Sequence, residues 1–339
     1  MNIKQHISLK THTTFGIEAY TSFWTEAVNE LDLSAALEYR EKNSLLLMIL
    51  GGGSNILLTQ DYSGLIIQNK SRGIQSETYS SNEVLVEVAA GENWHAFVQH
   101  CIANDWGGLE NLSLIPGSVG ASPMQNIGAY GCEIKDTFYS LRAMDIQDGS
   151  IHEFDAQQCK FGYRESIFKH EAKGRYIILS AKFKLTSKDH QIKTSYGAIS
   201  QELEKMGIQN PSIRDVSNAV IAIRKSKLPD PAVIGNAGSF FKNPVVENSI
   251  VEKIRSINPQ VVAYPADENH SKLAAGWLIE AAGWKGFRRG DAGVHALQAL
   301  VLVNYGNATG KEIWQLSQDV VDDVASKFGV ELEREVNIV

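Results

Sequence analysis

The stretch Leu45-Leu46-Leu47-Met48-Ile49-Leu50-Gly51-Gly52-Gly53-Ser54-Asn55-Ile56-Leu57-Leu58 decides the class of fold. Its first six residues are apolar and predict a buried strand, which the three glycines end. Consecutive glycines can present backbone N–H groups to a phosphate, although a plain turn explains the same residues equally well. The residues after Ser54 predict another strand. A Rossmann loop would open a helix here, and a P-loop would continue as Gly-Lys-Ser/Thr, so neither motif is present.

Helical and strand-like segments are mixed along the rest of the chain, which predicts the α+β class. Helical spacing and capping residues predict helices over 34–41, 94–104, 212–225, 246–257, 272–282 and 309–328. Short apolar segments predict strands over 65–67, 84–88, 176–185, 297–303 and 330–336. Leu228-Pro229-Asp230-Pro231 interrupts a helical segment and is a candidate domain boundary.

The composition is that of an ordinary globular protein, with 339 residues, 43% hydrophobic and 21% charged. This length predicts two or three domains. A formal net charge of −7 argues against nucleic-acid binding, which needs clustered basic residues. The longest apolar run, 45–50, is far shorter than the roughly 20 residues that span a membrane, and residues 1–14 lack an apolar signal core. We therefore expect a cytoplasmic protein that binds neither nucleic acid nor a membrane.

The cysteines and histidines give no pattern typical of a disulfide framework or a metal site. Cys101, Cys132 and Cys159 are odd in number and far apart, which suits a reducing compartment. The histidines lack the paired spacing of a metal site, so we expect no metal.

The segment Ile115–Gly131 is seventeen residues long and has no charged side chain. A long loop is usually either functional or disordered, and its Ile, Val, Met and Tyr residues argue against disorder. Its backbone amides, with Ser118, Ser122, Gln125 and Asn126, offer neutral hydrogen bonds. The segment is therefore either a ligand cradle or a packed structural loop.

The stretch Gly235-Asn236-Ala237-Gly238-Ser239-Phe240-Phe241-Lys242-Asn243-Pro244 holds one serine on a tight corner. The two glycines permit sharp backbone turns. Each phenylalanine ring, when fully buried, contributes about 1.5–3 kcal/mol of anchoring. Seen alone, these residues fit either an ordinary glycine loop or a serine hydroxyl fixed for chemistry.

Two charged residues stand out near apolar surroundings. Arg164, in Phe161-Gly162-Tyr163-Arg164, needs an anionic partner or a place on the surface. In Leu332-Glu333-Arg334-Glu335-Val336, strand alternation would place Glu333 and Glu335 on one face and Arg334 on the other. A solvated carboxylate explains Glu335 as well as an active-site carboxylate does.

Taken together and in order, these motifs resemble the UDP-N-acetylenolpyruvoylglucosamine reductase (MurB) family, from Thr14-Phe15-Gly16 to Val336. Lys227-Leu228-Pro229-Asp230 belongs to the same ordered set, and Tyr196 resembles the substrate-capping tyrosine of one branch of the family. Each motif alone is weak, but six in order with similar spacing are specific. The chain departs from the family pattern at Arg334, where a proline is usual, and at Asn337, where an arginine often follows.

The resemblance implies an FAD-binding fold of the vanillyl-alcohol-oxidase/PCMH type, with a two-part flavin region and a C-terminal α/β substrate domain. The flavin region would cover 14–190 together with the terminal strand 330–339. The tyrosine-loop insert and its connecting helix would cover 191–228. The substrate domain would cover 229–329. It implies that non-covalent FAD is cradled by Gly51, Gly52, Gly53, Ser54, Asn55, Ile115, Pro116, Gly117, Ser122, Asn126 and Gly128.

The resemblance also implies the reaction. NADPH would reduce FAD, and hydride would then pass from flavin N5 to C3 of UDP-N-acetylglucosamine enolpyruvate, in peptidoglycan precursor synthesis. Arg164 would hold the carboxylate with help from Glu335, and Ser239 would protonate C2. The sugar nucleotide would be bound by Tyr196, Lys227, Asn243 and Gln298. The enzyme is expected to act as a monomer on these small molecules. The alternatives are another FAD oxidoreductase of this fold and a non-redox protein that binds sugar nucleotides.

Overall fold

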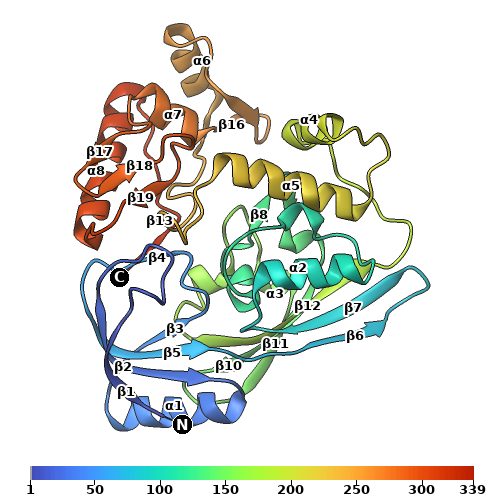
Figure 1. The fold of residues 1–339 in the computed structure, drawn as a ribbon, viewed down its shortest axis with the longest axis vertical. Coiled ribbons are helices and arrows are strands. Elements are labelled where there is room, and N and C mark those ends of the chain that lie inside the picture. Colours follow the sequence, from blue (N-terminus) through green and yellow to red (C-terminus); the bar gives the residue numbers. More distant parts are fainter. Residues whose placement is uncertain (1) are drawn as a thin grey trace. The chain divides into compact units, whose positions relative to one another are not determined.

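The computed structural model describes residues 2–339, which form two compact units, each made of segments far apart in the sequence. The first unit contains the described residues up to Ile7, with Thr21–Gly52 and Ser63–Ser226. The second contains Ser8–Tyr20, Gly53–Tyr62 and Lys227–Val339. Both units mix helices with sheets, as the α+β class predicts (Figure 1).

The predicted flavin region and the compact units do not share boundaries. Residues 8–20, 53–62 and 330–339 fall in the second unit, and most of the predicted tyrosine-loop insert falls in the first. The functional division of the chain therefore stays a prediction.

The first unit is built on two sheets. The four-stranded sheet has the order β1-β2-β5-β3, and its β3 and β5 run parallel. The five-stranded sheet has the order β11-β10-β12-β7-β6 and is antiparallel throughout. The strands are β1 Lys4–Ser8, β2 Tyr20–Ala27, β3 Leu46–Leu50, β5 Tyr62–Asn69, β6 Ile74–Thr78, β7 Glu83–Ala89, β10 Phe138–Asp145, β11 Ile151–Asp155 and β12 Tyr176–Thr186, with a small pair β8 Gly128–Ala129 and β9 Cys132–Glu133. The helices are α1 Glu30–Lys42, α2 Trp94–Ala103, α3 Ala156–Cys159, α4 Gly197–Lys205 and α5 Ile213–Lys227.

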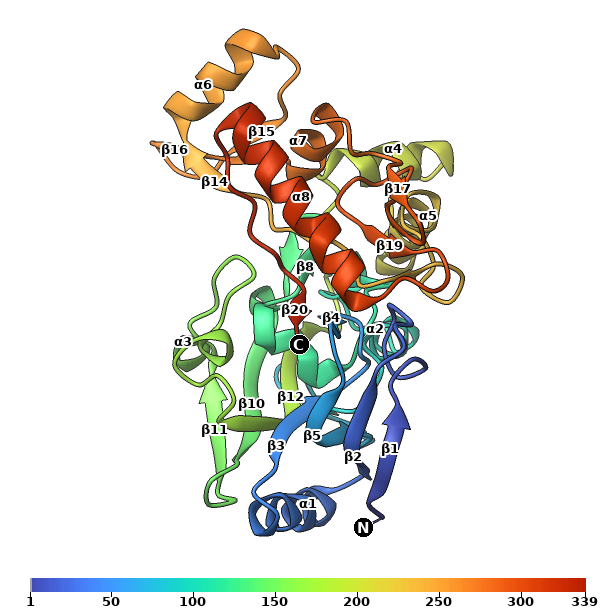
Figure 2. The ribbon, with the colours of Figure 1, turned by 90° about the vertical axis from the view of Figure 1, so that its left-hand side faces the viewer.

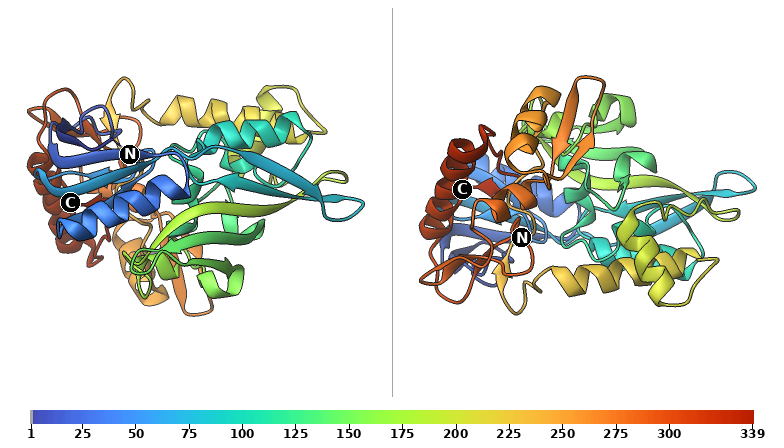
Figure 3. Two further views of the ribbon diagram at one scale, coloured as in Figure 1. Left: turned by 90° about the horizontal axis from the view of Figure 1, so that it is seen from below. Right: turned by 90° about the horizontal axis from the view of Figure 1, so that it is seen from above.

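Separate apolar clusters cover these sheets. Helix α1 packs Leu33 and Leu37 against Leu65 of β5 and Leu179 of β12. In the view from below, α1 lies along the strands of the first unit (Figure 3). Helix α2 contributes to another cluster with β7 and β12, in which its Phe97 packs against Phe183. In the first unit, α1 thus packs against strands of both sheets, and α2 packs against the five-stranded sheet.

The second unit gathers one core around its longest helix. The strands are β4 Ile56–Leu57, β13 Gly235–Asn236, β14 Val245–Glu247, β15 Ala263–Pro265, β16 His270–Leu273, β17 Arg288–Arg289, β18 Ala292–Val294, β19 Leu302–Asn304 and β20 Asn337–Ile338, and the helices are α6 Asn248–Ile257, α7 Ala275–Ala281 and α8 Gly310–Phe328. The sheets have the orders β13-β19-β18-β17, β14-β16-β15 and β20-β4. The buried side of α8, with Ile313, Leu316 and Val320, belongs to the same cluster as Val294 and Leu302. Helix α8 packs against β18, β19 and α7, and it is the long helix of this unit in Figure 2.

Helix α8 confirms its sequence prediction at both ends. Thr309 accepts a hydrogen bond from the Glu312 backbone, and the Glu312 side chain accepts one from the Thr309 backbone, which is a complete capping box. Gly329 ends the helix in the left-handed region, with φ of 67°. The predicted helix 94–104 is confirmed as α2, and the Asn93 side chain caps it by accepting a hydrogen bond from the Ala96 backbone.

Several predicted elements are wrong in part. The segment 272–282 is not one helix, because 272–273 belong to β16 and the helix begins at Ala275. The predicted strand 297–303 is confined to β19, and Leu297 is exposed. Residues 330–336 form no strand; Arg334 makes an isolated bridge with Phe241, and the terminal strand is β20. In each case contacts with residues distant in sequence, rather than the local sequence pattern, decide where the helix or strand begins and ends.

The first residue of α8 offers a test of this packing. A Cβ at Gly310 would lie 1.7 Å from the Leu58 carbonyl oxygen, so Gly310→Ala must push two segments of the second unit apart. We expect a loss of about 1–3 kcal/mol in the free energy of unfolding, measured by urea denaturation. Gly197→Ala is the matched control, because Gly197 is also the first residue of a helix and has open space around it. Equal stability of the two variants would contradict the packing.

Candidate active site

Two glycine-containing turns of the first unit approach each other closely. A Cβ at Gly52 would lie 2.9 Å from the Gly117 Cα, and one at Gly51 would lie 2.2 Å from the Ser118 Oγ. Only glycine allows this approach of backbone to backbone. The turn after β3 and the start of the uncharged segment 115–131 therefore form one surface rich in backbone groups, as expected of an anion cradle.

The remaining predicted cradle residues of the glycine motif belong to the second unit. Gly53 has φ of 61°, and its carbonyl oxygen accepts a hydrogen bond from the Thr14 backbone at 3.0 Å. Ser54 follows it and is half-buried. Asn55 donates from Nδ2 to the Glu335 carbonyl oxygen at 3.3 Å. The motif thus connects the glycine turn with the end of the chain.

The uncharged segment is more ordered than a loop, because Val119–Gln125 forms a 3-10 helix. Ser122 is buried, and its hydroxyl donates to the Val119 carbonyl oxygen at 2.7 Å. Asn126 is also buried and left-handed, with φ of 45°; its Nδ2 donates to Glu133 and Gly162, and its Oδ1 accepts from the Lys135 backbone. Both side chains therefore shape the segment, which leaves its backbone groups to meet a ligand. Ile115 packs on the core of the first unit, while Pro116 is exposed.

Arg164 lies on a tight turn tied to the uncharged segment. Its backbone is left-handed, with φ of 57°, between mutual backbone hydrogen bonds of Gly162 and Glu165. The guanidinium donates from Nη2 to the Gly128 carbonyl oxygen at 2.5 Å and lies 5.3 Å from the centre of the Tyr163 ring. Because Asn126 also bonds to Gly162, the same residues fix both the segment and the arginine.

Tyr196 meets Tyr130, which in turn bonds to Arg224, a residue to which the sequence analysis gave no role. The rings of Tyr196 and Tyr130 are 5.5 Å apart at 84°, and the Tyr130 hydroxyl and the Arg224 side chain are hydrogen-bond partners. Arg224 also donates from Nε to the Leu114 carbonyl oxygen at 3.2 Å. Burial lowers the pKa of Arg224, and across residues 2–339 no carboxylate pairs with it. A guanidinium in such a place is suited to an anionic ligand.

Ser239 has the geometry that its motif predicts. A Cβ at Gly235 would lie 2.2 Å from the Phe15 carbonyl oxygen, and Gly238 has φ of 71°, so both glycines are required. Phe240 and Phe241 are fully buried, with ring centres 5.3 Å apart. Ser239 itself is exposed, and its hydroxyl has no hydrogen-bond partner among the described residues.

Glu335 is fixed beside this corner by the backbone. Its N–H donates to the Phe240 carbonyl oxygen at 2.8 Å, and the Lys242 N–H donates to the Glu333 carbonyl oxygen at 2.9 Å. These bonds surround the bridge between Phe241 and Arg334. Glu335 is half-buried, and its backbone bond to Phe240 places it across a short antiparallel pairing from the residue that follows Ser239. The structure thus brings these two predicted residues together within one unit.

Two of the predicted substrate residues meet at the start of α7. The Asn243 Oδ1 accepts from the Ala275 backbone at 2.9 Å, and a Cβ at Gly276 would lie 3.2 Å from the Gln298 Oε1. Lys227 is the exposed last residue of α5. Sequence analysis also gave no role to Lys242, which is buried and pairs with Glu333 at 2.5 Å. The sequence did offer a sign that Lys242 is buried and paired, because it directly follows two core phenylalanines and a buried lysine is almost always paired.

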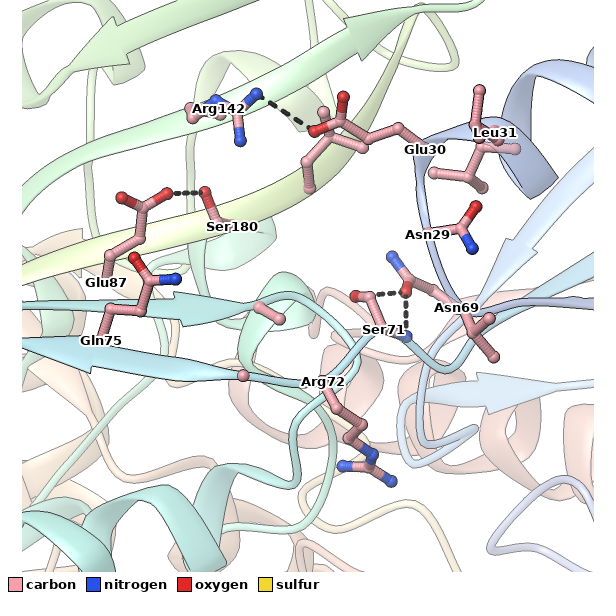
Figure 4. A pocket seen from close by; sticks show the side chains of 15 residues that line it. Asn29, Glu30, Leu31, Asn69, Ser71, Arg72, Gln75, Glu87, Arg142 and Ser180 are labelled. Atoms are coloured by element: carbon pink, nitrogen blue, oxygen red, sulfur yellow. Dashed lines mark hydrogen bonds and ion pairs between the residues drawn. The ribbon is translucent and has the colours of Figure 1, made fainter.

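A cavity of about 830 Å³ in the first unit is separate from the predicted residues (Figure 4). Its charged groups pair with one another or with close neighbours: Arg142 with Glu30 at 3.1 Å and Arg72 with Glu92 at 3.0 Å. Glu87 accepts from the Ser180 hydroxyl at 2.6 Å. The two arginines and two glutamates of the lining balance each other, so the cavity has no excess positive charge with which to hold a phosphate.

Family models match both parts of the chain. Residues 23–155 match an FAD binding domain, and residues 230–339 match the C-terminal domain of UDP-N-acetylenolpyruvoylglucosamine reductase. The UDP-N-acetylenolpyruvoylglucosamine reductase of Pseudomonas syringae pv. syringae (strain B728a) is 51% identical over 338 residues, covering 100% of this chain and 99% of its own. The chain belongs to the UDP-N-acetylenolpyruvoylglucosamine reductase family.

Solved structures agree on the fold. UDP-N-acetylenolpyruvylglucosamine reductase (MurB) from Thermus caldophilus superposes with a TM-score of 0.68 at 23% identity, covering 100% of this chain and 99% of its own. 6-Hydroxy-D-nicotine oxidase from Arthrobacter nicotinovorans superposes with a TM-score of 0.53 at 11% identity, covering 97% and 86%. The predicted flavin-binding fold class is confirmed.

The family match also confirms FAD as the cofactor, and the residues fit it. A diphosphate needs closely approaching backbone N–H groups, and the Gly51–Gly52 turn against Gly117 supplies a surface that any side chain would fill. Burial raises the pKa of the Cys132 thiol to about 11 and that of Cys159 to about 12, so neither is a ready nucleophile. Within residues 2–339 no group of three or more His, Cys, Asp or Glu is arranged to hold a metal ion, and no helix is long and apolar enough to cross a membrane.

The glycine cradle gives a test based on flavin retention. Gly52→Ala places its Cβ against the Gly117 backbone, which cannot move aside, so we expect purified protein with much less than one FAD per chain by visible absorbance. Gly51→Ala instead meets the Ser118 side chain. Adding Ser118→Ala should restore part of the FAD content to Gly51→Ala but none to Gly52→Ala. Full FAD content in Gly52→Ala would remove this turn from the cofactor site.

Proposed function

We propose that this protein reduces the enolpyruvyl group of UDP-N-acetylglucosamine enolpyruvate to the lactyl group of UDP-N-acetylmuramate, with NADPH as reductant. The product is a precursor of peptidoglycan. FAD, when bound, accepts a hydride from NADPH and delivers it to C3 of the enolpyruvyl double bond. A proton added at C2 completes the reduction. The family membership and the free Ser239 hydroxyl beside Glu335 are the observations that support this proposal.

Ser239 is proposed to protonate C2. A serine is a poor acid in water, so its hydroxyl must be held in line with the carbon that takes the proton and must be assisted by neighbouring charge. The exposed hydroxyl is not occupied by any described residue, and the Phe240 and Phe241 rings hold its backbone. A fixed and unoccupied hydroxyl is what this role requires.

Arg164 and Glu335 are proposed to stabilise the charge that develops on the enolpyruvyl carboxylate. A guanidinium matches a carboxylate through paired N–H donors, and the Arg164 guanidinium is held beside the uncharged segment by its bond to the Gly128 carbonyl oxygen. Loss of one such electrostatic donor typically costs about 3–4 kcal/mol of transition-state stabilisation. Glu335 assists by positioning the proton.

The sugar nucleotide is proposed to bind through Tyr196, Lys227, Asn243 and Gln298. Lys227 brings a point charge on a flexible stem, as suits a phosphate. Arg224, beside Tyr130 and Tyr196, adds a second cation near the uncharged segment. We further propose that the protein acts in the cytoplasm as a monomer.

Separated half-reactions test the role of Ser239. In Ser239→Ala, we expect reduction of the bound flavin by NADPH to keep its normal rate, because no hydroxyl proton is needed there. Oxidation of the reduced enzyme by the enolpyruvyl substrate should slow by about 10²–10⁴-fold, since a general acid is lost. Stopped-flow absorbance of the flavin measures both steps. Ser256→Ala, an exposed serine of α6, is the control. Equal slowing of both half-reactions would refute the acid role.

A further inference from the structure

We propose that Arg334 is a positioning residue for Glu335: it anchors the terminal segment to helix α8 and so fixes the direction in which the Glu335 carboxylate points. The proposal rests on the role of Glu335 given above. The side-chain contacts of Arg334 are with helix α8, so it would affect the reaction only through the orientation of Glu335.

The side chain of Arg334 is held at three points on one helix. Its Nε donates to the Ser317 Oγ at 2.8 Å, and its Nη2 donates to the Gln318 Oε1 at 2.7 Å. Its guanidinium lies 5.7 Å from the centre of the Trp314 ring. Ser317 is fully buried, and its hydroxyl in turn donates to the Trp314 carbonyl oxygen at 2.6 Å. The flat guanidinium matches two acceptors at once, which a lysine would not do.

The backbone converts this anchor into a direction for Glu335. Around the bridge of Arg334 with Phe241, the chain has the pairing of an antiparallel strand. Neighbouring side chains on such a backbone point to opposite sides. Because Arg334 points to α8, Glu335 must point away from α8. A rotation of the segment that redirected Glu335 would have to break both hydrogen bonds to Ser317 and Gln318.

The chain is also held on the C-terminal side of Glu335, so Glu335 lies between two anchored residues, Arg334 and Asn337. Asn337 donates from both its backbone N and its Nδ2 to the Asn55 carbonyl oxygen, at 3.2 and 2.9 Å. Asn55 returns a bond from Nδ2 to the Glu335 carbonyl oxygen. The residues on each side of Glu335 therefore fix its backbone without using its carboxylate.

A double-mutant cycle tests the inference in the FAD-loaded enzyme. Arg334→Met should slow the oxidative half-reaction by roughly tenfold to a hundredfold, as expected for a displaced catalytic group, and leave flavin reduction by NADPH unchanged. In a Glu335→Gln background, adding Arg334→Met should slow the oxidative step by less than about twofold, because coupled residues are not additive. This non-additivity is the readout that a purely structural role would not produce.

Two further variants keep the test decisive. Arg289→Met is the matched control: Arg289 also binds α8, through Asp319 at 2.8 Å, but does not touch the terminal segment, so both half-reactions should keep their rates. Gln318→Ala removes one acceptor and should slow the oxidative step in the same direction as Arg334→Met, even if the latter folds poorly.

The outcomes separate the two levels of the proposal. If Glu335→Gln is slow but Arg334→Met and Gln318→Ala are not, the positioning role is overturned and the proposed function stands. If Arg334→Met slows the step equally with and without Glu335, Arg334 acts by another route and the inference also fails. A wild-type rate for Glu335→Gln would remove Glu335 from the mechanism and Arg334 with it.

Discussion

The second unit depends on one short antiparallel pairing between residues 240–242 and 333–335. Its backbone bonds, from Glu335 to Phe240 and from Lys242 to Glu333, connect segments that are almost a hundred residues apart in sequence. The Ser239 corner and Glu335 share this pairing, so neither can move without the other. Segments 8–20 and 53–62 join the same unit, through bonds such as that of Asn55 to the Glu335 carbonyl oxygen. Closure of the chain on itself is thus the condition for the Ser239–Glu335 arrangement.

The polar groups around this pairing are arranged so that few are left unsatisfied in the core. Lys242 is buried, and its ammonium pairs with Glu333, whose carboxylate remains exposed. The Glu333 side chain is 69% exposed, so solvent screens this pair and it contributes less than a fully buried pair would. The ion pair reinforces the register that the backbone bonds define, and a slip by one residue would lose both.

Local sequence information was sufficient wherever the structure is locally determined. The bounds of α8 and the glycine corner before Ser239 depend on residues within a few positions, and the structure has them as predicted. The prediction of a strand over 330–336 was wrong. Apolar and polar residues do alternate there, but the segment pairs with Phe241 through an isolated bridge at Arg334 and not through a ladder. Arg224 was not recognised as a site residue, because its burial and its bond to Tyr130 arise from tertiary packing. No pattern near Arg224 in sequence reports these contacts.

An arginine anchored by neutral acceptors suits a segment that carries a titratable group. Burial lowers the pKa of Arg334, yet an arginine remains charged across the pH range in which enzymes work. Its bonds to Ser317 and Gln318 do not titrate either, and the bonds that hold Asn55 to Glu335 and Asn337 are also neutral at the acceptor. The contribution of these bonds is therefore independent of pH. The Lys242–Glu333 ion pair adds a contact between charged groups to the same segment.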